Sequence, residues 1–419
     1  MKAVRTMVAA GARKAWLRRN RSAFRQSDAA EQPRLLVDVS AIIRHDAQTG
    51  IQRVVRAVWS ELSRREGADF VLQPVFASNV AGYRLAPRDF LAHKRSFTAE
   101  PAGVRPGDKF LGLDLAAHLL PYYRGQLKAW KAHGASIHLV VYDLLPLLRP
   151  DWFTSASASN FRKWYNVLND DADQAICISD QVASDLRQRI GGARRRGPAI
   201  VRMQMGADIA ASVPSTGISP EVSALLHRLR FRPAVLMVGT VEPRKGYEPA
   251  LAAFEWIWRT RSTEAPDLVI VGKPGWKTCE LQAKLRDHPE RGARLHWLTN
   301  VSDEALCRLY DASAGVLVAS YAEGFGLPLL EATMFRRHVL ARDLAVFREQ
   351  PLANVSYFTD DSAALLGDQL LHMVAASKTR PAPPATLASW ADCVDGLLRE
   401  IGIEAGATRP TESTLRKAS

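Results

Sequence analysis

The chain has 419 residues, of which 47% are hydrophobic and 24% are charged, a composition typical of a soluble globular protein and not of a disordered or fibrous one. This length exceeds what one ordinary hydrophobic core accommodates, so we expect two domains. The four cysteines lie far apart and no apolar run approaches the roughly 20 residues of a membrane-spanning helix, which argues against a structural zinc site and against a membrane span.

The net charge of +13 is unevenly distributed along the chain. Residues 1–25 carry eight Lys or Arg residues and no acid, and they lack the apolar centre of a signal peptide. A solvated tail, an anchor on anionic lipid and a nucleic-acid-binding arm are all compatible with this segment. We take the lipid anchor as the working hypothesis, because each basic residue near an anionic bilayer contributes about 1 kcal/mol.

From residue 34 onward the pattern predicts strands that alternate with helices. In the first half we expect strands at 34–40, 109–115, 137–146 and 174–179, and helices at 51–65 and at 180–190, the latter with Asp180 as its N-cap. Such alternation is typical of right-handed crossovers and a mainly parallel sheet.

A loop-rich stretch at 191–200 and 206–221 then indicates a connection between domains, after which the pattern restarts. The second half predicts strands at 234–240, 267–272, 315–320 and 338–343, and helices at 247–260, at 302–313 with Ser302 as N-cap, and around 390–401. The resulting division is a basic segment (1–33), two Rossmann-like domains (34–212 and 213–378), a C-terminal helix (379–402) and a disordered tail (403–419). Two parallel sheets in series predict a ligand-binding cleft at their carboxyl edges.

The stretch YAEGFGLPLLEA (321–332) places Glu323 and Glu331 around a glycine-rich turn that leads into a helix. Glycines let the backbone approach a ligand closely, and a helix N-terminus favours anionic oxygens. A second such loop, VGTVEPRKGYEPA (238–250), adds Arg244 and Lys245. Both loops could be ordinary strand-to-helix turns. Together, however, they suit a diphosphate, with the two glutamates accepting bonds from sugar hydroxyls, and the sequence predicts a nucleotide-sugar site.

VGTVEPRKG, LVIVGKPGW, HWLTNVSDEALCRLYDAS and EGFGLPLLEA, in this order, resemble the family 4 retaining glycosyltransferases. Glu323 and Glu331 match the E-x7-E motif of that family, whose α/β GT-B fold has two Rossmann-like domains with parallel sheets facing a central cleft. The first half, with LLVDVSAIIRHDAQTGIQRVVRAV and VVYDLLPLLRPDWF, is similar to bacterial mannosyl and rhamnosyl transferases of O-antigen and exopolysaccharide synthesis. The resemblance runs from about residue 34 to residue 349.

The resemblance implies a role for ten residues of this chain. The catalytic group comprises Glu323 at the donor sugar, Lys245 and Arg244 at the diphosphate, and Asp143 at the sugar or acceptor. The donor-binding group comprises Gly50, Thr240, the backbone amides of Phe325, Gly326 and Leu327, and Glu331 at the ribose. The chain departs from the family pattern at Thr240, where many members carry Arg, at Tyr142, where many carry His, and at Arg336–Arg337, where a small glycine-containing turn is common.

The implied reaction transfers a hexose, with mannose from GDP-mannose favoured, to a hydroxyl of a growing bacterial surface glycan. A rhamnosyl or glucosyl transfer from a dTDP- or UDP-sugar is the alternative, and a noncatalytic glycan- or nucleotide-binding relic of the fold is a rival from another class. We expect no metal and no cofactor, and we interpret the acidic run 169–173 as a solvated helix-end turn. The expected partners are the donor, a glycan or lipid-linked glycan acceptor and an anionic membrane surface, at a cytoplasmic location. Nucleic acid is disfavoured, because the positive charge is concentrated in one terminal arm.

Overall fold

The computed structural model describes residues 32–46, 48–67, 69–78, 82–92, 100–190, 197–261, 265–384 and 387–403. The basic segment 1–25 lies outside this range, and so does the predicted tail from residue 404 onward. Ile403 is described and is 4% exposed, so this residue is packed and does not belong to a disordered tail. Within the described part of the chain, no helix is long and apolar enough to cross a membrane.

The first domain is built on a seven-stranded sheet with the strand order β3-β2-β1-β4-β5-β6-β7. Its strands are β1 (Arg34–Asp38), β2 (Val71–Ser78), β3 (Gly82–Leu85), β4 (Lys109–Gly112), β5 (Ser136–Val141), β6 (Gln174–Cys177) and β7 (Ala199–Arg202). Its helices are α2 (Gly50–Arg65), α3 (Arg124–Ala132), α4 (Leu145–Leu148), α5 (Ser155–Asp171) and α6 (Asp180–Ile190), with short 3-10 turns η2 (Leu120–Tyr123) and η3 (Pro150–Trp152). The pair β2–β3 is antiparallel, whereas the other strand pairs are parallel.

The second domain carries a six-stranded parallel sheet with the order β10-β9-β8-β11-β12-β13. Its strands are β8 (Ala234–Val238), β9 (Asp267–Val271), β10 (Leu295–Leu298), β11 (Gly315–Val318), β12 (His338–Arg342) and β13 (Val355–Phe358). Its helices are α7 (Pro220–Arg228), α8 (Tyr247–Thr260), α9 (Cys279–Arg286), α10 (Asp303–Ala312), α11 (Leu327–Met334), α12 (Ala345–Arg348) and α13 (Ala363–Ala376), with the 3-10 turn η5 (Pro243–Lys245). In each sheet the strands that follow the first strand are added on one side of it and the later strands on the other, and open α/β sheets bind ligands at this switch point.

The second sheet is covered by helices on both faces because its strands are apolar on both sides. Along β8, Val235 and Met237 belong to the core beneath α8 and α13, whereas Leu236 belongs to the core that includes α10 and α11. Such continuous apolar runs are typical of parallel strands buried on both faces. The sheet therefore holds rigidly the loops that leave its carboxyl edge.

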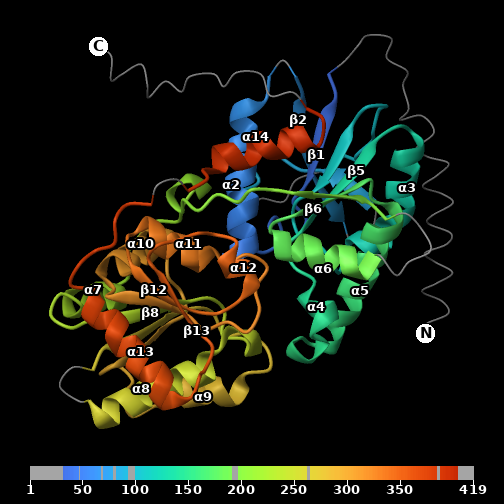
Figure 1. Cartoon of the computed structure of the whole chain (residues 1–419). Helices are drawn as coiled ribbons and strands as arrows, with labels where there is room; N and C mark the ends of the chain where they lie inside the picture. Colours follow the sequence, from blue (N-terminus) through green and yellow to red (C-terminus); the bar gives the residue numbers. More distant parts are fainter. Residues whose placement is uncertain are drawn as a thin grey trace, which may run out of the picture.

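The chain passes into the second domain through the short turn η4 (Ala210–Ser212) and returns to the first domain at its C-terminal end. The returning helix α14 (Trp390–Glu400) packs against α2, as Figure 1 shows. Trp390 donates from Nε1 to the backbone oxygen of Asp208 at 2.9 Å, and Arg65 of α2 contacts Asp395 at 2.6 Å. The first domain thus includes two segments that are distant in the sequence.

Several local predictions differ from the structure. The strand expected at 137–146 ends at Val141, because Leu145–Leu148 form a helical turn. Asp180 is the first residue of α6 and not its N-cap; the Ser179 hydroxyl accepts the bond from the Val182 amide. The stretch expected to be a connecting loop contains the edge strand β7. Ser302 caps α10 as predicted, accepting from the Ala305 amide.

Candidate active site

The two predicted phosphate-facing loops leave neighbouring strands of the second sheet. Because β8 and β11 pair in parallel, the loops that follow them start at the same sheet edge. The loop after β8 contains η5 with Arg244 and Lys245, and the loop after β11 contains Glu323. The backbone amide of Tyr321 donates to the Arg244 oxygen at 2.7 Å and joins the two loops directly.

Glu323 is bound by both cations of the neighbouring loop. Arg244 Nη1 lies 2.7 Å from one carboxylate oxygen, Lys245 Nζ lies 2.5 Å from the other, and the Ser320 hydroxyl donates to the latter at 2.7 Å. Burial raises the pKa of the Glu323 carboxyl, but the charges of Lys245 and Arg244 outweigh burial and hold that pKa at about 2. Glu323 is therefore ionised at any physiological pH, and its negative charge is neutralised within the site.

Glu242 is a second acid in this cluster, and the sequence analysis assigned it no role. Its carboxylate lies 2.8 Å from Arg244 Nη2, and its side chain is 4% exposed. Burial raises the pKa of Glu242, and the nearby charge of Arg244 offsets part of that increase. Arg244 is thus held by an acid on each side, which fixes the direction of its guanidinium. A sequence signal existed, because Glu242 lies two residues before Arg244 in the same EPRK motif.

The glycine-rich turn is required by close contacts on both sides. Gly326 has a φ of +96°, and a Cβ atom there would lie 2.5 Å from a ring carbon of Phe347. A Cβ atom on Gly324 would lie 1.9 Å from the backbone oxygen of Tyr142, which belongs to the first domain. The bend is therefore shaped for close packing against Phe347 within its own domain and against the end of β5 across the domain interface.

The helix α11 begins at Leu327, directly after this bend. The first amides of a helix have no acceptor within the helix, so this end of α11 is suited to anionic oxygens, as the sequence predicted for Phe325, Gly326 and Leu327. Gly50, the first residue of α2, faces the same place: a Cβ atom there would lie 3.6 Å from Leu327 Cδ1. The positive ends of two helices, one from each domain, thus meet at the predicted diphosphate position.

Asp143 is brought from the first domain to the same cluster, and its contact with the sugar or acceptor stays a prediction. Its Cβ atom lies 3.2 Å from the position of a Cβ atom on Gly324, and its carboxylate accepts from the Leu145 amide at 3.0 Å. Burial raises the pKa of Asp143, and the positive charge of Arg244 offsets part of that rise. Thr240 follows β8, where its methyl group packs beside Gly275.

Glu331 lies in a separate network of side chains. It is 1% exposed, Arg53 Nη1 of the first domain contacts its Oε1 atom, and the Tyr310 hydroxyl donates to its Oε2 atom at 2.7 Å. The sequence analysis missed Arg53 and Tyr310. The sequence did contain one signal for Arg53. The first turn of its helix has no acid, and a cation there opposes the helix dipole, which suggests that an acid from another element binds it.

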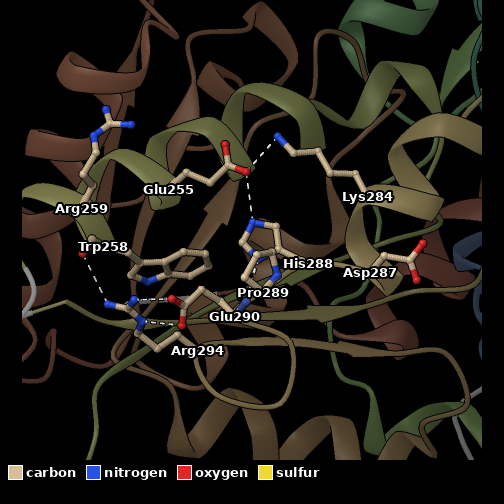
Figure 2. Close-up of a pocket in the computed structure, with 9 residues that line it drawn as sticks. All are labelled: Glu255, Trp258, Arg259, Lys284, Asp287, His288, Pro289, Glu290 and Arg294. Atoms are coloured by element: carbon tan, nitrogen blue, oxygen red, sulfur yellow. Dashed lines mark hydrogen bonds and ion pairs between the residues drawn. The ribbon is translucent and has the colours of Figure 1, made fainter.

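A surface cavity of about 480 Å³ lies elsewhere on the second domain (Figure 2). It is lined by the C-terminal half of α8, the end of α9 and the segment before β10, which places it at the amino edge of the sheet. Its polar groups pair with one another: His288 and Lys284 contact Glu255, and Arg294 contacts Glu290. The predicted site residues do not line it, and we locate the candidate site at the opposite, carboxyl edge of the sheet.

The acidic run 169–173 forms the end of α5, as predicted, but it is less solvated than expected. Asp171 is 6% exposed and contacts Arg124, and Lys131 lies 2.7 Å from Asp173. Among the described residues, no group of three or more His, Cys, Asp or Glu side chains is arranged to hold a metal ion. The independence from metal remains a prediction.

Two Rossmann-like domains, with paired cations and acids where the carboxyl edge of the second sheet meets the first domain, define an α/β protein with the GT-B arrangement. Residues 230–373 match the family described as glycosyl transferases group 1. This match covers the part of the chain that carries both candidate donor loops, and it supports the resemblance to glycosyltransferases seen in their motifs.

Among proteins of known function, the chain is similar to the serotype-specific mannosyltransferase WbdA of Escherichia coli, with 37% identity over 388 residues. That alignment covers 90% of this chain but 46% of WbdA, so the chain spans about half the length of the curated relatives it matches. Among solved structures, the Anabaena protein HepE has a TM-score of 0.58 at 15% identity, covering 89% of this chain and 100% of HepE. WaaG, a glycosyltransferase involved in lipopolysaccharide biosynthesis, has a TM-score of 0.52 at 13% identity, covering 92% of this chain and 98% of WaaG. These likenesses confirm the predicted GT-B fold.

Proposed function

We propose that this chain transfers a mannosyl residue from GDP-mannose to a hydroxyl of a growing bacterial surface glycan, with retention of the anomeric configuration. The observation that carries the proposal is the cluster of Arg244, Lys245 and Glu323 at the carboxyl edge of the second sheet, facing Asp143 of the first domain. Cations and helix ends there suit a diphosphate, and carboxylates beside them suit sugar hydroxyls. The likeness to the E. coli mannosyltransferase supports mannose as the sugar.

In the proposed reaction the acceptor oxygen attacks the anomeric carbon while the bond from that carbon to the diphosphate oxygen breaks. The acceptor proton passes to the departing phosphate oxygen on the same face of the sugar. Arg244 and Lys245 stabilise the charge that develops on the leaving diphosphate, because preorganised cations in a buried site need no rearrangement when that charge appears. Glu323 holds a hydroxyl of the donor sugar and stays ionised throughout.

The domain contact is part of this mechanism. Gly324 touches Tyr142, so the donor loop and the acceptor-side loop meet when the domains are together. The loop after β9 also reaches the first domain: Trp276 Nε1 donates to the Trp152 backbone oxygen at 2.8 Å. Bringing the domains together excludes water that would otherwise hydrolyse the donor.

The first test is calorimetric binding of GDP, UDP and dTDP to the purified chain without added metal. Preference for GDP supports a mannosyl donor, whereas preference for UDP or dTDP changes the sugar to a glucosyl or rhamnosyl residue. Transfer from GDP-mannose is then measured with excess chelator, and NMR of the product linkage reports retention or inversion. Binding without turnover on any acceptor glycan would favour the noncatalytic alternative, and loss of transfer in chelator would refute metal independence.

We also propose that the acceptor is lipid-linked and that the reaction occurs at the cytoplasmic face of the membrane. The eight basic residues of segment 1–25 support this location. Co-sedimentation of the full chain with phosphatidylglycerol vesicles, but not with phosphatidylcholine vesicles, is the expected result at low salt. Equal binding to both lipids would refute the electrostatic anchor.

A further inference from the structure

Arg53 connects the two domains through two buried acids. It lies in the first turn of α2, in the first domain, and both of its acidic partners belong to the second domain. Its Nη1 atom contacts Glu331 and its Nη2 atom lies 3.1 Å from Asp303, while its own side chain is 12% exposed. Figure 1 shows α2 running from the first domain toward α10 and α11, which carry the two acids. A guanidinium fork thus bridges two carboxylates across the domain interface.

The partners of Arg53 are held rigidly on the side of the second domain. Asp303 is the first residue of α10, and its Oδ2 atom accepts from the backbone amide and the hydroxyl of Ser215, each at 2.9 Å. Glu331 accepts from Tyr310, which is fully buried and stacked on Phe335 with 5.3 Å between ring centroids. Both acids therefore keep their positions, and Arg53 is the partner that arrives from outside the domain.

The two contacts of Glu331 do not use all of its lone pairs, but the side chain is 1% exposed, so a ligand reaches the remaining ones only when a neighbouring group moves aside. An ionised carboxylate offers about four lone-pair sites on its two oxygens. Arg53 uses a site on Oε1 and Tyr310 uses a site on Oε2. One site on each oxygen then remains, which matches the two neighbouring hydroxyls of a ribose.

Without Arg53, the same carboxylate would be poorly prepared for this role. Glu331 and Asp303 are 1% and 4% exposed, and a buried carboxylate without a counter-charge is disfavoured in its ionised form. Without Arg53, the orientation of Glu331 would depend on Tyr310 alone. The contact between Arg53 and Glu331 thus fixes the direction of the ribose-facing acid.

We propose that Arg53 is a positioning residue for Glu331: it reaches Glu331 when the domains come together, so that the ribose hydroxyls of the donor are recognised in full in this closed arrangement. The inference rests on the proposed function, because it takes Glu331 as the ribose-binding acid. The effect is reciprocal by thermodynamic linkage. If domain closure raises the affinity for the nucleotide by a certain factor, binding of the nucleotide raises the equilibrium constant for closure by the same factor.

The test compares GDP with 2′-deoxy-GDP, measured by calorimetry on the full chain. In the wild type we expect the missing hydroxyl to weaken binding by tenfold or more, since an acid built to accept a hydroxyl is left unpaired. In Arg53→Gln the ratio of the two dissociation constants should fall below about threefold. Because that variant leaves two buried acids without their cation, Arg53→Lys is measured as well. Lysine keeps the charge but offers no fork for both acids, so its ratio should lie between the other two.

Two control variants separate positioning from general effects on stability or domain contact. Arg56 lies on the same helix and is also buried, and its charge also acts on Asp303, but its hydrogen bonds go to Asp46 inside the first domain; Arg56→Gln should therefore retain the wild-type ratio. Glu349 of the second domain accepts from the amides of Asp180 and Gln181 at 2.9 and 2.6 Å. Glu349→Gln therefore weakens another domain contact, and it should change the affinity for both nucleotides equally and retain the ratio.

The outcomes distinguish this inference from the proposed function. If the wild type binds neither nucleotide, or binds both equally, the ribose site itself is refuted. If the wild type binds GDP more tightly than 2′-deoxy-GDP and both Arg53 variants keep the same ratio of dissociation constants, the positioning role is refuted while the proposed function stands. A loss of affinity in Arg53→Gln that is equal for GDP and 2′-deoxy-GDP would also overturn the inference, because it would indicate that Arg53 contacts the phosphates or serves as a domain contact only.

Discussion

Gly324→Ala separates the chemistry of the site from the contact between the domains. The three atoms nearest to a Cβ at this position are Tyr142 O at 1.9 Å, Tyr142 C at 3.0 Å and Asp143 Cβ at 3.2 Å, all in the first domain. The substitution therefore leaves the second domain unstrained but prevents the two loops from meeting. Tyr142 cannot move aside easily, because its ring is 4% exposed and its hydroxyl donates to the Leu113 oxygen at 2.7 Å.

The size of the effect follows from these distances. Since Cβ atoms essentially never approach another heavy atom within 3.0 Å, the loops must separate by about 1 Å or more. A misplacement of about 1 Å at a reacting centre typically costs on the order of a hundredfold in rate, or about 2.7 kcal/mol in the activation free energy. We therefore expect the kcat for mannosyl transfer to fall about a hundredfold.

Affinity for GDP, measured by calorimetry, should fall much less than the rate, because the cations that hold the diphosphate lie in the second domain and only the part of the affinity that depends on the Arg53–Glu331 contact is lost when the domains separate. Gly103→Ala is the control, since a Cβ atom there meets nothing within 4 Å. A normal rate for Gly324→Ala would refute the reasoning, because it would mean that the two loops do not touch in the productive arrangement. An equal loss of rate and of GDP affinity would instead show that the methyl group blocks the donor itself.

Three further predictions follow from the charged groups. Lys245→Ala should weaken GDP binding about ten- to a hundredfold in calorimetry, because it removes a charge-assisted contact. Lys284→Ala is the control: it alters an exposed ion pair at the opposite edge of the sheet and should leave GDP binding unchanged. The pKa of Glu323 is lowered from 4.5 to about 2, so its ion pairs contribute about 3 kcal/mol of stability above pH 4.5, which is lost as the pH falls toward 2. In urea unfolding, the difference in stability between the wild type and Glu323→Gln should therefore shrink as the pH is lowered. A difference that stays constant with pH would contradict this. Burial raises the pKa of Asp38 to about 7, so near neutral pH the folded state binds a proton that the unfolded state releases. The wild type should therefore be about 1 kcal/mol more stable at pH 6 than at pH 8. If Asp38→Asn is stabilised by the same amount between pH 8 and pH 6, another group is responsible.

Much of the second domain was predictable because its signals are local. The helix at 247–260 was predicted with its observed bounds, and Ser302 was recognised as an N-cap from its position before an amphipathic run. The two candidate donor loops stood out in the sequence through glycines, cations and acids within a dozen residues of one another. Such features depend on backbone conformations and neighbours along the chain, which the sequence displays directly.

The short edge strands and the acid-binding partners were not predictable in the same way. The edge strands β3 and β13 carry mixed apolar and polar residues, and they are strands because they pair with a neighbouring strand. The longer β2, between β3 and β1, also has a mixed pattern and was not predicted. Asp180 was expected to cap α6, whereas Ser179 does so and Glu349, from the other domain, binds the amides of Asp180 and Gln181. The identity of a partner across 169 residues of chain depends on how two finished domains pack.

By itself, the sequence determined the fold class, the two-domain organisation and the residues that form the donor loops. It also supplied Glu323 and Glu331, but it did not distinguish their environments. The tertiary structure decided that Glu323 is neutralised inside its own domain by Arg244 and Lys245, and that Glu331 contacts Arg53, 278 residues away in the other domain. The physical reason is that the direction of a buried acid depends on which cation lies beside it, and for Glu331 that cation is placed there by the packing of one domain against the other.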